Sequence, residues 1–245
     1  MSGVLPTAYC LLPIAYCLLP TAYCLLPIAY CLLPTAYCPT MELQISDLAC
    51  IRGGRQVFAG LSLRADGGSL TLLRGANGAG KTSLLRLIAG IAEPDRGRIA
   101  LLGGDAALTL SQQCHFIGDR DATKLHLTVA ENLRFWGAFL DGGDLDRALD
   151  SFGLKALANL QAVVLSSGQR RRLALSRLAL VARPLWLLDE PTVGLDAASR
   201  DRLAALMAAH LATGGIIIAA THVELGLAGI ELRLGEALVR EVAAQ

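Results

Sequence analysis

After residue 40, short apolar runs alternate with longer segments of helical periodicity. The runs LQIS, VFAGLSLR, LTLLRG and RIALLGG are rich in residues that favour strands, and the Gly-Gly pairs at 53–54, 67–68 and 103–104 punctuate them. This pattern predicts short strands joined by turns. Residues 128–180 instead show the spacing of a helical region.

Two later runs, PLWLLDE at 184–190 and GGIIIAAT at 214–221, are apolar almost without interruption. A strand that is buried on both faces loses the usual alternation, so these runs predict strands of a parallel sheet flanked by helices. We therefore predict an α/β fold with a mostly parallel core sheet, an antiparallel β edge at the N-terminal side and a helical subdomain at about residues 120–180.

The first 40 residues follow a different pattern, because the phrase P-x-A-Y-C recurs in them at seven-residue intervals. A signal peptide is disfavoured because no basic segment comes first. A proline at every seventh residue costs a helix about 3 kcal/mol per interior proline in water, although membrane helices tolerate proline better. Translation of a repeated seven-base unit, CTGCCTA, produces the same period. We interpret 1–40 as a low-complexity leader, disordered or translated from repeat DNA, and 41–245 as the working domain starting at Met41.

The charge and the cysteine content of residues 41–245, the body of the chain, limit the class of protein that it can belong to. All 22 basic and 21 acidic residues follow residue 40, so the body has no charge bias toward nucleic acid, and no nucleic-acid partner is expected. Of seven cysteines, only Cys50 and Cys114 lie outside the leader, which indicates neither a disulfide framework nor a zinc site. The longest uncharged run of the body, around LATGGIIIAATHV, is shorter than the ~18 residues of a membrane span, so we expect a water-soluble body.

The most informative segment is LTLLRGANGAGKTSLLRLIAG at 70–90, which contains G-x-x-x-x-G-K-T after a predicted strand and before a predicted helix. Its glycines allow main-chain N–H groups to surround phosphate oxygens, and the helix adds its N-terminal dipole. Lys81 is expected between the β- and γ-phosphates, Thr82 on Mg²⁺ and Ser83 at the α-phosphate. The predicted nucleotide-binding residues are Gly75, Ala76, Asn77, Gly78, Ala79, Gly80, Lys81, Thr82 and Ser83.

Two acids, Asp189 and Glu190, follow the predicted strand PLWLL. They lie at the carboxyl edge of the sheet, where ligands of α/β proteins bind. Asp189 is expected to hold Mg²⁺ together with Thr82, and Glu190 to polarise the attacking water as general base. The alternative, that two acids simply end a strand, is less favoured because a phosphate loop needs such partners.

Three further motifs carry a resemblance to the ATP-binding-cassette ATPases. LSSGQ resembles their signature L-S-G-G-Q, Leu195 and Asp196 after EPTVG are similar to their D-loop, and His222 follows an apolar strand where their switch histidine belongs. The resemblance covers 41–245 and implies ATP and Mg²⁺ as cofactors, with catalytic roles for Glu190, His222 and Lys81. The signature residues, expected to contact ATP held by the other subunit, are Leu165, Ser166, Ser167, Gly168 and Gln169.

The same resemblance implies a head-to-tail homodimer. The signature helix is expected to begin near Gln169 and to direct its free N–H groups at the γ-phosphate in the partner's loop. The signature residues have no ligand within their own subunit, so the dimer would hold two ATP molecules, each between the phosphate loop of one subunit and the signature of the other. Loss of the γ-phosphate would then open the dimer.

Some positions depart from the family pattern. Ser167 replaces a signature glycine, and its small size should preserve close approach to phosphate. The usual glutamine after the strand CHFI is missing, and its place falls near Asp119 or Arg120, so the link of that loop to metal, water and a membrane partner stays open. Where an aromatic residue commonly stacks on adenine, the chain has Ile51 or Arg52, of which Arg52 offers a guanidinium plane.

FIGDRDATKLHLTVAENLRFWGAFL, together with LSSGQRRRLALSRL, resembles the CcmA family, the ATPase subunits of the bacterial haem exporter of cytochrome c maturation. This implies an integral membrane permease partner, CcmB-like with a CcmC-like subunit as a further candidate, and a place on the cytoplasmic face of the inner membrane. No C-x-x-C-H motif occurs, so haem is expected on the partners, and His115, His126 and His210 are expected to be surface or packing residues. The alternatives are the ATPase of another small exporter and a soluble ATP-driven switch.

Overall fold

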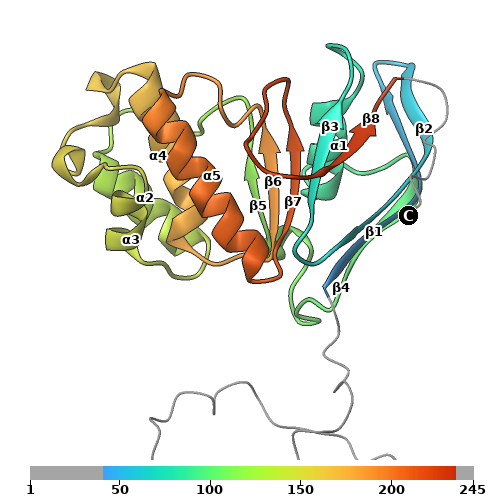
Figure 1. The fold of residues 1–245 in the computed structure, drawn as a ribbon, viewed down its shortest axis with the longest axis horizontal. Coiled ribbons are helices and arrows are strands. Elements are labelled where there is room, and N and C mark those ends of the chain that lie inside the picture. The colour runs from blue at the N-terminus through green and yellow to red at the C-terminus, as the bar shows by residue number, and fades with distance from the viewer. Residues whose placement is uncertain (1–40, 236–245) are drawn as a thin grey trace, which may run out of the picture. The chain divides into compact units, whose positions relative to one another are not determined.

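The structure is a computed structural model that describes residues 41–235 (Figure 1). The predicted leader and residues 236–245 lie outside the described residues, so the interpretation of 1–40 stays a prediction. Eight strands in the described part form two sheets. An antiparallel sheet has the order β2-β1-β4, with bounds Glu42–Arg52 for β1, Arg55–Asp66 for β2 and Arg96–Leu102 for β4. A parallel sheet has the order β5-β6-β7-β3-β8, with bounds Leu70–Arg74, Cys114–Ile117, Leu185–Asp189, Ile216–Ala220 and Ile230–Arg233 for β3, β5, β6, β7 and β8.

The predicted α/β architecture is confirmed, and the antiparallel strands at the N-terminal side form a sheet of their own. The α-helices are α1 Lys81–Ile88, α2 Val129–Phe139, α3 Leu145–Ser151, α4 Ser167–Leu180 and α5 Ala197–Ala212. Short 3-10 helices lie at Ser111–Gln113, Lys155–Leu157 and Ala162–Val164. Figure 1 shows α2, α3 and α4 gathered on the β5 side of the parallel sheet, away from the antiparallel sheet.

Strands β6 and β7 are buried along their whole length, and their side chains alternate between two hydrophobic cores. Leu185 and Leu187 pack into the core that contains leucines of β1 and α1. Trp186 and Leu188 point to the other face, into the core formed with α4 and α5. Because both faces of these strands are covered, both kinds of position must be apolar, which explains the unbroken runs in the sequence.

Helices α2 and α4 both begin with a capping box. In α4, the hydroxyl of Ser166 accepts the N–H of Gln169 at 3.2 Å, and the Gln169 side chain accepts the N–H of Ser166 at 2.8 Å. A box of this kind stabilises a helix start by about 1 kcal/mol. The cap places the first helical residue at Ser167, two residues before the start expected near Gln169.

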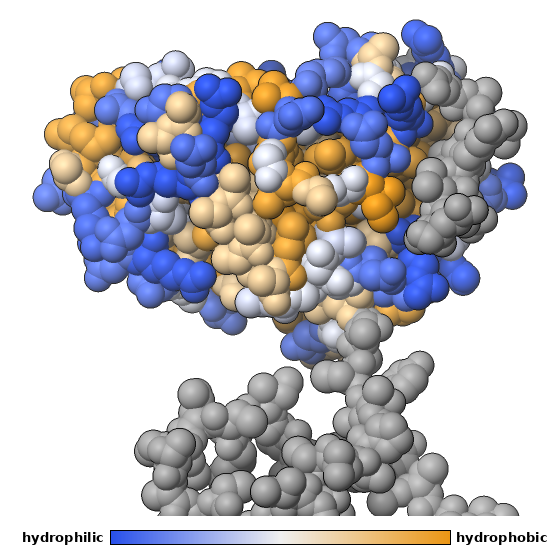
Figure 2. Space-filling view, in the orientation of Figure 1, coloured by the Kyte–Doolittle hydropathy of each residue, from blue (hydrophilic) through white to orange (hydrophobic). Residues whose placement is uncertain are grey.

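The surface shown in Figure 2 is mostly hydrophilic over α2, α3 and α4, with a paler, more apolar band over α5 and the central strands. Within residues 41–235, no helix is both long enough and apolar enough to cross a membrane. The two cysteines of this part, Cys50 and Cys114, are buried free thiols, as their isolation in the sequence indicates.

Candidate functional site

The glycine-rich segment 75–80 joins the end of β3 to the start of α1, as predicted. Gly75 and Gly80 have φ values of 140° and 101°, which residues with a side chain rarely adopt. A Cβ on Gly75 would also overlap the carbonyl oxygen of Leu234. No side chain caps α1, so its first N–H groups remain available. Free N–H groups at a helix start form a binding site for an anion such as phosphate.

Lys81 holds its ammonium group inside this loop. Its Nζ donates to the carbonyl oxygens of Gly75 at 2.7 Å and Ala76 at 3.2 Å, and it lies 3.3 Å from Nε2 of His222. The residue is only 8% exposed. A positive charge fixed among the N–H groups of the loop suits a phosphate ligand, because both attract the same anion.

Thr82 and Asp189 meet at the carboxyl ends of the strands, where Oγ1 of Thr82 donates to Oδ2 of Asp189 at 2.7 Å. Asp189 is buried. Mg²⁺ in phosphate-binding enzymes commonly takes one or two protein oxygens and completes its shell with phosphate and water. The hydroxyl and carboxylate pair therefore fits Mg²⁺ once a nucleotide supplies the remaining oxygens.

Glu190 and His222 lie next to this pair, at the ends of β6 and β7. Oε1 of Glu190 is 3.5 Å from Nε2 of His222, which places the histidine between Glu190 and Lys81. Glu190 has φ +45°, a left-handed conformation that costs a residue with a side chain about 1 kcal/mol or more. Its N–H donates to the carbonyl of Ala220 at 2.8 Å, which helps to hold that conformation.

The signature residues lie elsewhere in the subunit. Within residues 41–235, no hydrogen bond joins residues 165–169 to residues 75–83, and Figure 1 shows α4 and α1 apart, with strands of the parallel sheet between them. Gly168 packs against the segment before the D-loop, since an added Cβ would lie 2.8 Å from the carbonyl oxygen of Gly194. Asp196 of that loop caps α5 through Ser199, and these hydrogen bonds hold the pKa of Asp196 below its usual range.

In the loop after β5, where the glutamine usual in the family is missing, two aspartates make different contacts. Asp119 is exposed and lies 3.9 Å from Arg86, while it is Asp121 that lies 3.2 Å from a buried arginine, Arg171. Arg171 was not predicted as a site residue. Its Nη2 donates to the carbonyl oxygens of Asp189, the last residue of β6, and of Glu190, which follows it.

A sequence signal for Arg171 exists in LSSGQRRRLALSRL. Arg171, Ala174, Leu175 and Leu178 have the i, i+3, i+4, i+7 spacing of an apolar helix stripe, and all four are buried in α4, as are the other residues from 173 to 180. A charged residue on such a stripe must be paired, so its position in the pattern predicts a buried contact.

The other histidines of the body have packing or surface positions, as expected. His115 is buried, its Nε2 lies 2.8 Å from the carbonyl oxygen of Val181, and burial lowers its pKa to about 4. His210 stacks on Trp186 with ring centroids 3.9 Å apart, and burial lowers its pKa to about 4 as well. His126 is exposed.

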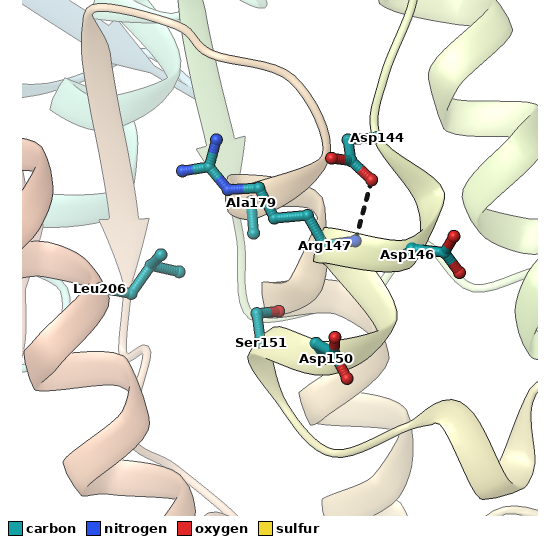
Figure 3. A pocket seen from close by; sticks show the side chains of 7 residues that line it. All are labelled: Asp144, Asp146, Arg147, Asp150, Ser151, Ala179 and Leu206. Carbon is teal, nitrogen blue, oxygen red and sulfur yellow. Dashed lines mark hydrogen bonds between the residues drawn. The ribbon is translucent and has the colours of Figure 1, made fainter.

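A hollow of about 610 Å³ beside α3 contains none of the predicted site residues (Figure 3). Its acidic residues have local structural roles. Asp144 caps α3 by accepting the N–H of Arg147 at 2.9 Å, and Asp150 pairs with Lys155 on the surface. The residues Lys81, Thr82, Asp189, Glu190 and His222 lie instead near the carboxyl ends of β3, β6 and β7.

This fold and this arrangement of loop, paired oxygens, carboxylate and histidine define an ATP-binding-cassette ATPase. The family model described as ABC transporter matches residues 58–193. The fold is also similar to a putative ABC transporter ATP-binding protein from Pyrococcus furiosus, with a TM-score of 0.67 at 22% identity over 79% of this chain and 97% of that one. An ATP-binding cassette solved in its ADP conformation has a TM-score of 0.65 at 20% identity, over 79% of this chain and 87% of that one.

Comparison with curated relatives identifies the family within the ATP-binding-cassette ATPases. The cytochrome c biogenesis ATP-binding export protein CcmA of Bradyrhizobium diazoefficiens is 56% identical over 197 residues, which cover 80% of this chain and 98% of that protein. The protein of the same name from Rhodopseudomonas palustris strain BisB18 is 56% identical over 199 residues, covering 80% and 100%. The chain belongs to the CcmA family of cytochrome c biogenesis ATP-binding export proteins.

Proposed function

We propose that this chain hydrolyses Mg²⁺-ATP to drive a bacterial export complex that serves cytochrome c biogenesis. The observation that carries the proposal is the meeting of Lys81, Thr82, Asp189, Glu190 and His222 at the ends of three neighbouring strands. The printed names of the relatives add export and cytochrome c biogenesis to that chemistry.

Each side chain of the site has a role that its position supports. Lys81 and the N–H groups of the loop from Gly75 to Ser83 would bind the phosphates, and Mg²⁺ held by Thr82 and Asp189 would offset the charge of the phosphate oxygens. Glu190 would take a proton from the attacking water. His222, which lies between Glu190 and Lys81 in this structure, would then hold Glu190 or the terminal phosphate in place.

We further propose that the active form is a head-to-tail homodimer. The start of α4 offers N–H groups that favour an anion, yet no hydrogen bond in the described residues joins the signature to the phosphate loop of its own subunit. In a dimer, the residues Leu165, Ser166, Ser167, Gly168 and Gln169 would close over ATP in the partner's loop. Loss of the γ-phosphate would weaken that contact and open the dimer.

The names of the relatives describe an export protein, and export across a membrane involves a membrane-embedded subunit. We propose an integral permease subunit, CcmB-like with a CcmC-like subunit as a further candidate, which would keep this ATPase on the cytoplasmic face of the bacterial inner membrane. Haem or a haem-loaded carrier would be handled by the partners, since the sequence has no C-x-x-C-H motif.

The variant Glu190→Gln tests the chemistry. An amide cannot accept the proton of water at neutral pH, so hydrolysis should fall by about 100-fold or more while ATP affinity is kept and a dimer accumulates. Phosphate release, nucleotide affinity and the molar mass in solution would be measured. Glu93→Gln, at an exposed position between α1 and β4, is the matched control and should behave as the parent.

Normal hydrolysis by Glu190→Gln would refute the role of Glu190 as base. The transport role has a separate test, in which the chain is produced with and without its permease and the membranes are sedimented. Sedimentation with the membrane only when the permease is present is expected. A chain that stays in the soluble fraction in both cases would favour the alternative of a soluble ATP-driven switch.

A further inference from the structure

Arg171 on α4 joins three segments at the catalytic end of β6. Its side chain is 6% exposed. Nη1 donates to the carbonyl oxygen of Gly118 at 2.8 Å and lies 3.2 Å from Oδ1 of Asp121. Nη2 donates to the carbonyl oxygens of Asp189 at 3.0 Å and Glu190 at 2.8 Å. One guanidinium group therefore binds the loop after β5 and both residues that end β6.

Only arginine suits this position. The guanidinium group is planar and presents its N–H donors in a fixed fork, so it can bind acceptors on several sides at once. A lysine ammonium would keep the charge, but it cannot span carbonyl groups of separate segments with the same geometry. Because the group is buried, any carbonyl oxygen that loses its donor would stay unsatisfied or shift to find another one.

The main chain of Glu190 depends on this contact. Its N–H donates to the carbonyl of Ala220 at 2.8 Å, and its carbonyl oxygen accepts from Arg171. The residue between these two bonds has φ +45°, a conformation that persists only where the surroundings hold it. Arg171 thus binds the main chain of the residue whose carboxylate lies 3.5 Å from His222.

Asp121 supplies the opposite charge. Its charge also acts on a second buried guanidinium group: burial lowers the pKa of Arg177 to about 10, and the negative charge of Asp121 opposes that change. The side chain of Asp121 is 25% exposed, so it lies at the boundary between the buried arginines and the surface. A change in the position of the loop would reach Arg171 through this carboxylate.

We propose that Arg171 is a positioning residue for ATP hydrolysis: it orients Glu190 through the Glu190 carbonyl, and Asp121 makes that orientation depend on the loop after β5. This inference rests on the proposed function, because it requires Glu190 to act as base. The loop is the one that lacks the usual glutamine. In this chain the pair of Asp121 and Arg171 provides its link to the catalytic carboxylate, so a partner that moves the loop would alter hydrolysis without touching the nucleotide.

The first test is Arg171→Lys, with steady-state ATP hydrolysis measured on the purified chain and normalised to folded protein. Displacing a reacting group by about 1 Å can lower the rate up to ~100-fold, so kcat should fall by about 10- to 100-fold. The KM for ATP should change by less than about threefold, because Arg171 makes no contact with the phosphate loop among its hydrogen bonds.

Arg183→Lys is the matched control. Arg183 also donates to two main-chain carbonyl oxygens, those of Gln112 and Leu140, but it lies just before β6, at the end of that strand far from Glu190. Its replacement should lower the melting temperature and leave kcat as in the parent. A parent-like kcat in Arg171→Lys, or a parallel rise in KM, would overturn the proposal.

The second test combines Arg171→Lys with Glu190→Gln in a single-turnover assay. If Arg171 acts through Glu190, its replacement should lower the residual rate of the Glu190→Gln chain by less than about twofold, since residues that act as a unit are not additive. A full 10- to 100-fold further loss would overturn the inference while leaving Glu190 as base. Normal hydrolysis by Glu190→Gln alone would instead overturn the proposed function, and this inference with it.

Asp121→Asn covers the case in which Arg171→Lys does not fold, because the amide keeps the size of the side chain and removes only its charge. We expect kcat to fall by about three- to tenfold with KM unchanged, a smaller effect because the carbonyl contacts of Arg171 persist. An unchanged kcat in this variant would overturn the role of Asp121 and of the loop.

Discussion

Lowering the pH should destabilise this protein through His115. The ring is 4% exposed, and its Nε2 faces the carbonyl oxygen of Val181 at 2.8 Å. Because a carbonyl only accepts, Nε2 carries a hydrogen and donates it to Val181. Burial lowers the pKa of His115 from 6.5 to about 4. Protonation would place a charge on a ring that has lost its water.

The direction of the pH effect on stability follows from how many protons His115 binds in the folded and in the unfolded chain. In the unfolded chain His115 takes up a proton below pH 6.5, whereas in the fold it does so only near pH 4. The stability from the neutral ring is therefore complete above pH 6.5 and is lost as the pH falls toward 4. A shift of this size corresponds to about 3 kcal/mol in full, and to about 2 kcal/mol between pH 7 and pH 5.

Urea denaturation at pH 7, 6 and 5 would measure this loss in the parent and in His115→Gln, whose amide can still donate to the Val181 carbonyl. The variant should lose about 2 kcal/mol less than the parent between pH 7 and 5. His126→Gln, at an exposed position, should follow the parent. His210 is present in all three chains, so its own titration contributes to each of the three measured losses. Equal losses in parent and His115→Gln would refute the reasoning.

Two further substitutions test the site and the core. Lys81→Ala should weaken ATP binding by about 10- to 100-fold, because a hydrogen bond to a charged group contributes about 1.5–3 kcal/mol. Calorimetry would measure the affinity for ATP, with the surface variant Lys155→Ala as control. An unchanged affinity would count against the assignment of Lys81 to the phosphates. Phe152→Ala should cost about 3–5 kcal/mol in the free energy of unfolding, since the ring is fully buried in the core under α4; a loss below about 1 kcal/mol in urea denaturation would contradict that packing.

Local chemistry accounts for what the sequence by itself determined. Backbone geometry, capping and helix dipoles act over a few positions. Neighbouring residues in the sequence therefore determine which strands are buried, where the phosphate loop between β3 and α1 forms and where α2 begins. The spacing of Gly75, Lys81 and Thr82 therefore predicts their arrangement directly. The same holds for Asp189 and Glu190, since the first polar residues after the apolar run fall at the end of β6.

Contacts between distant segments were decided only by the tertiary structure. The order of the strands places His222 between Lys81 and Glu190, which are 141 and 32 positions away in the chain. The antiparallel strands form a separate sheet, and in the loop after β5 Asp121 pairs with the buried Arg171, whereas Asp119 lies near Arg86. Arg171 could be placed on a buried stripe from its spacing, but its acceptors lie on other elements. Which acceptors a buried guanidinium meets depends on how helix and sheet pack, and no local pattern contains that information.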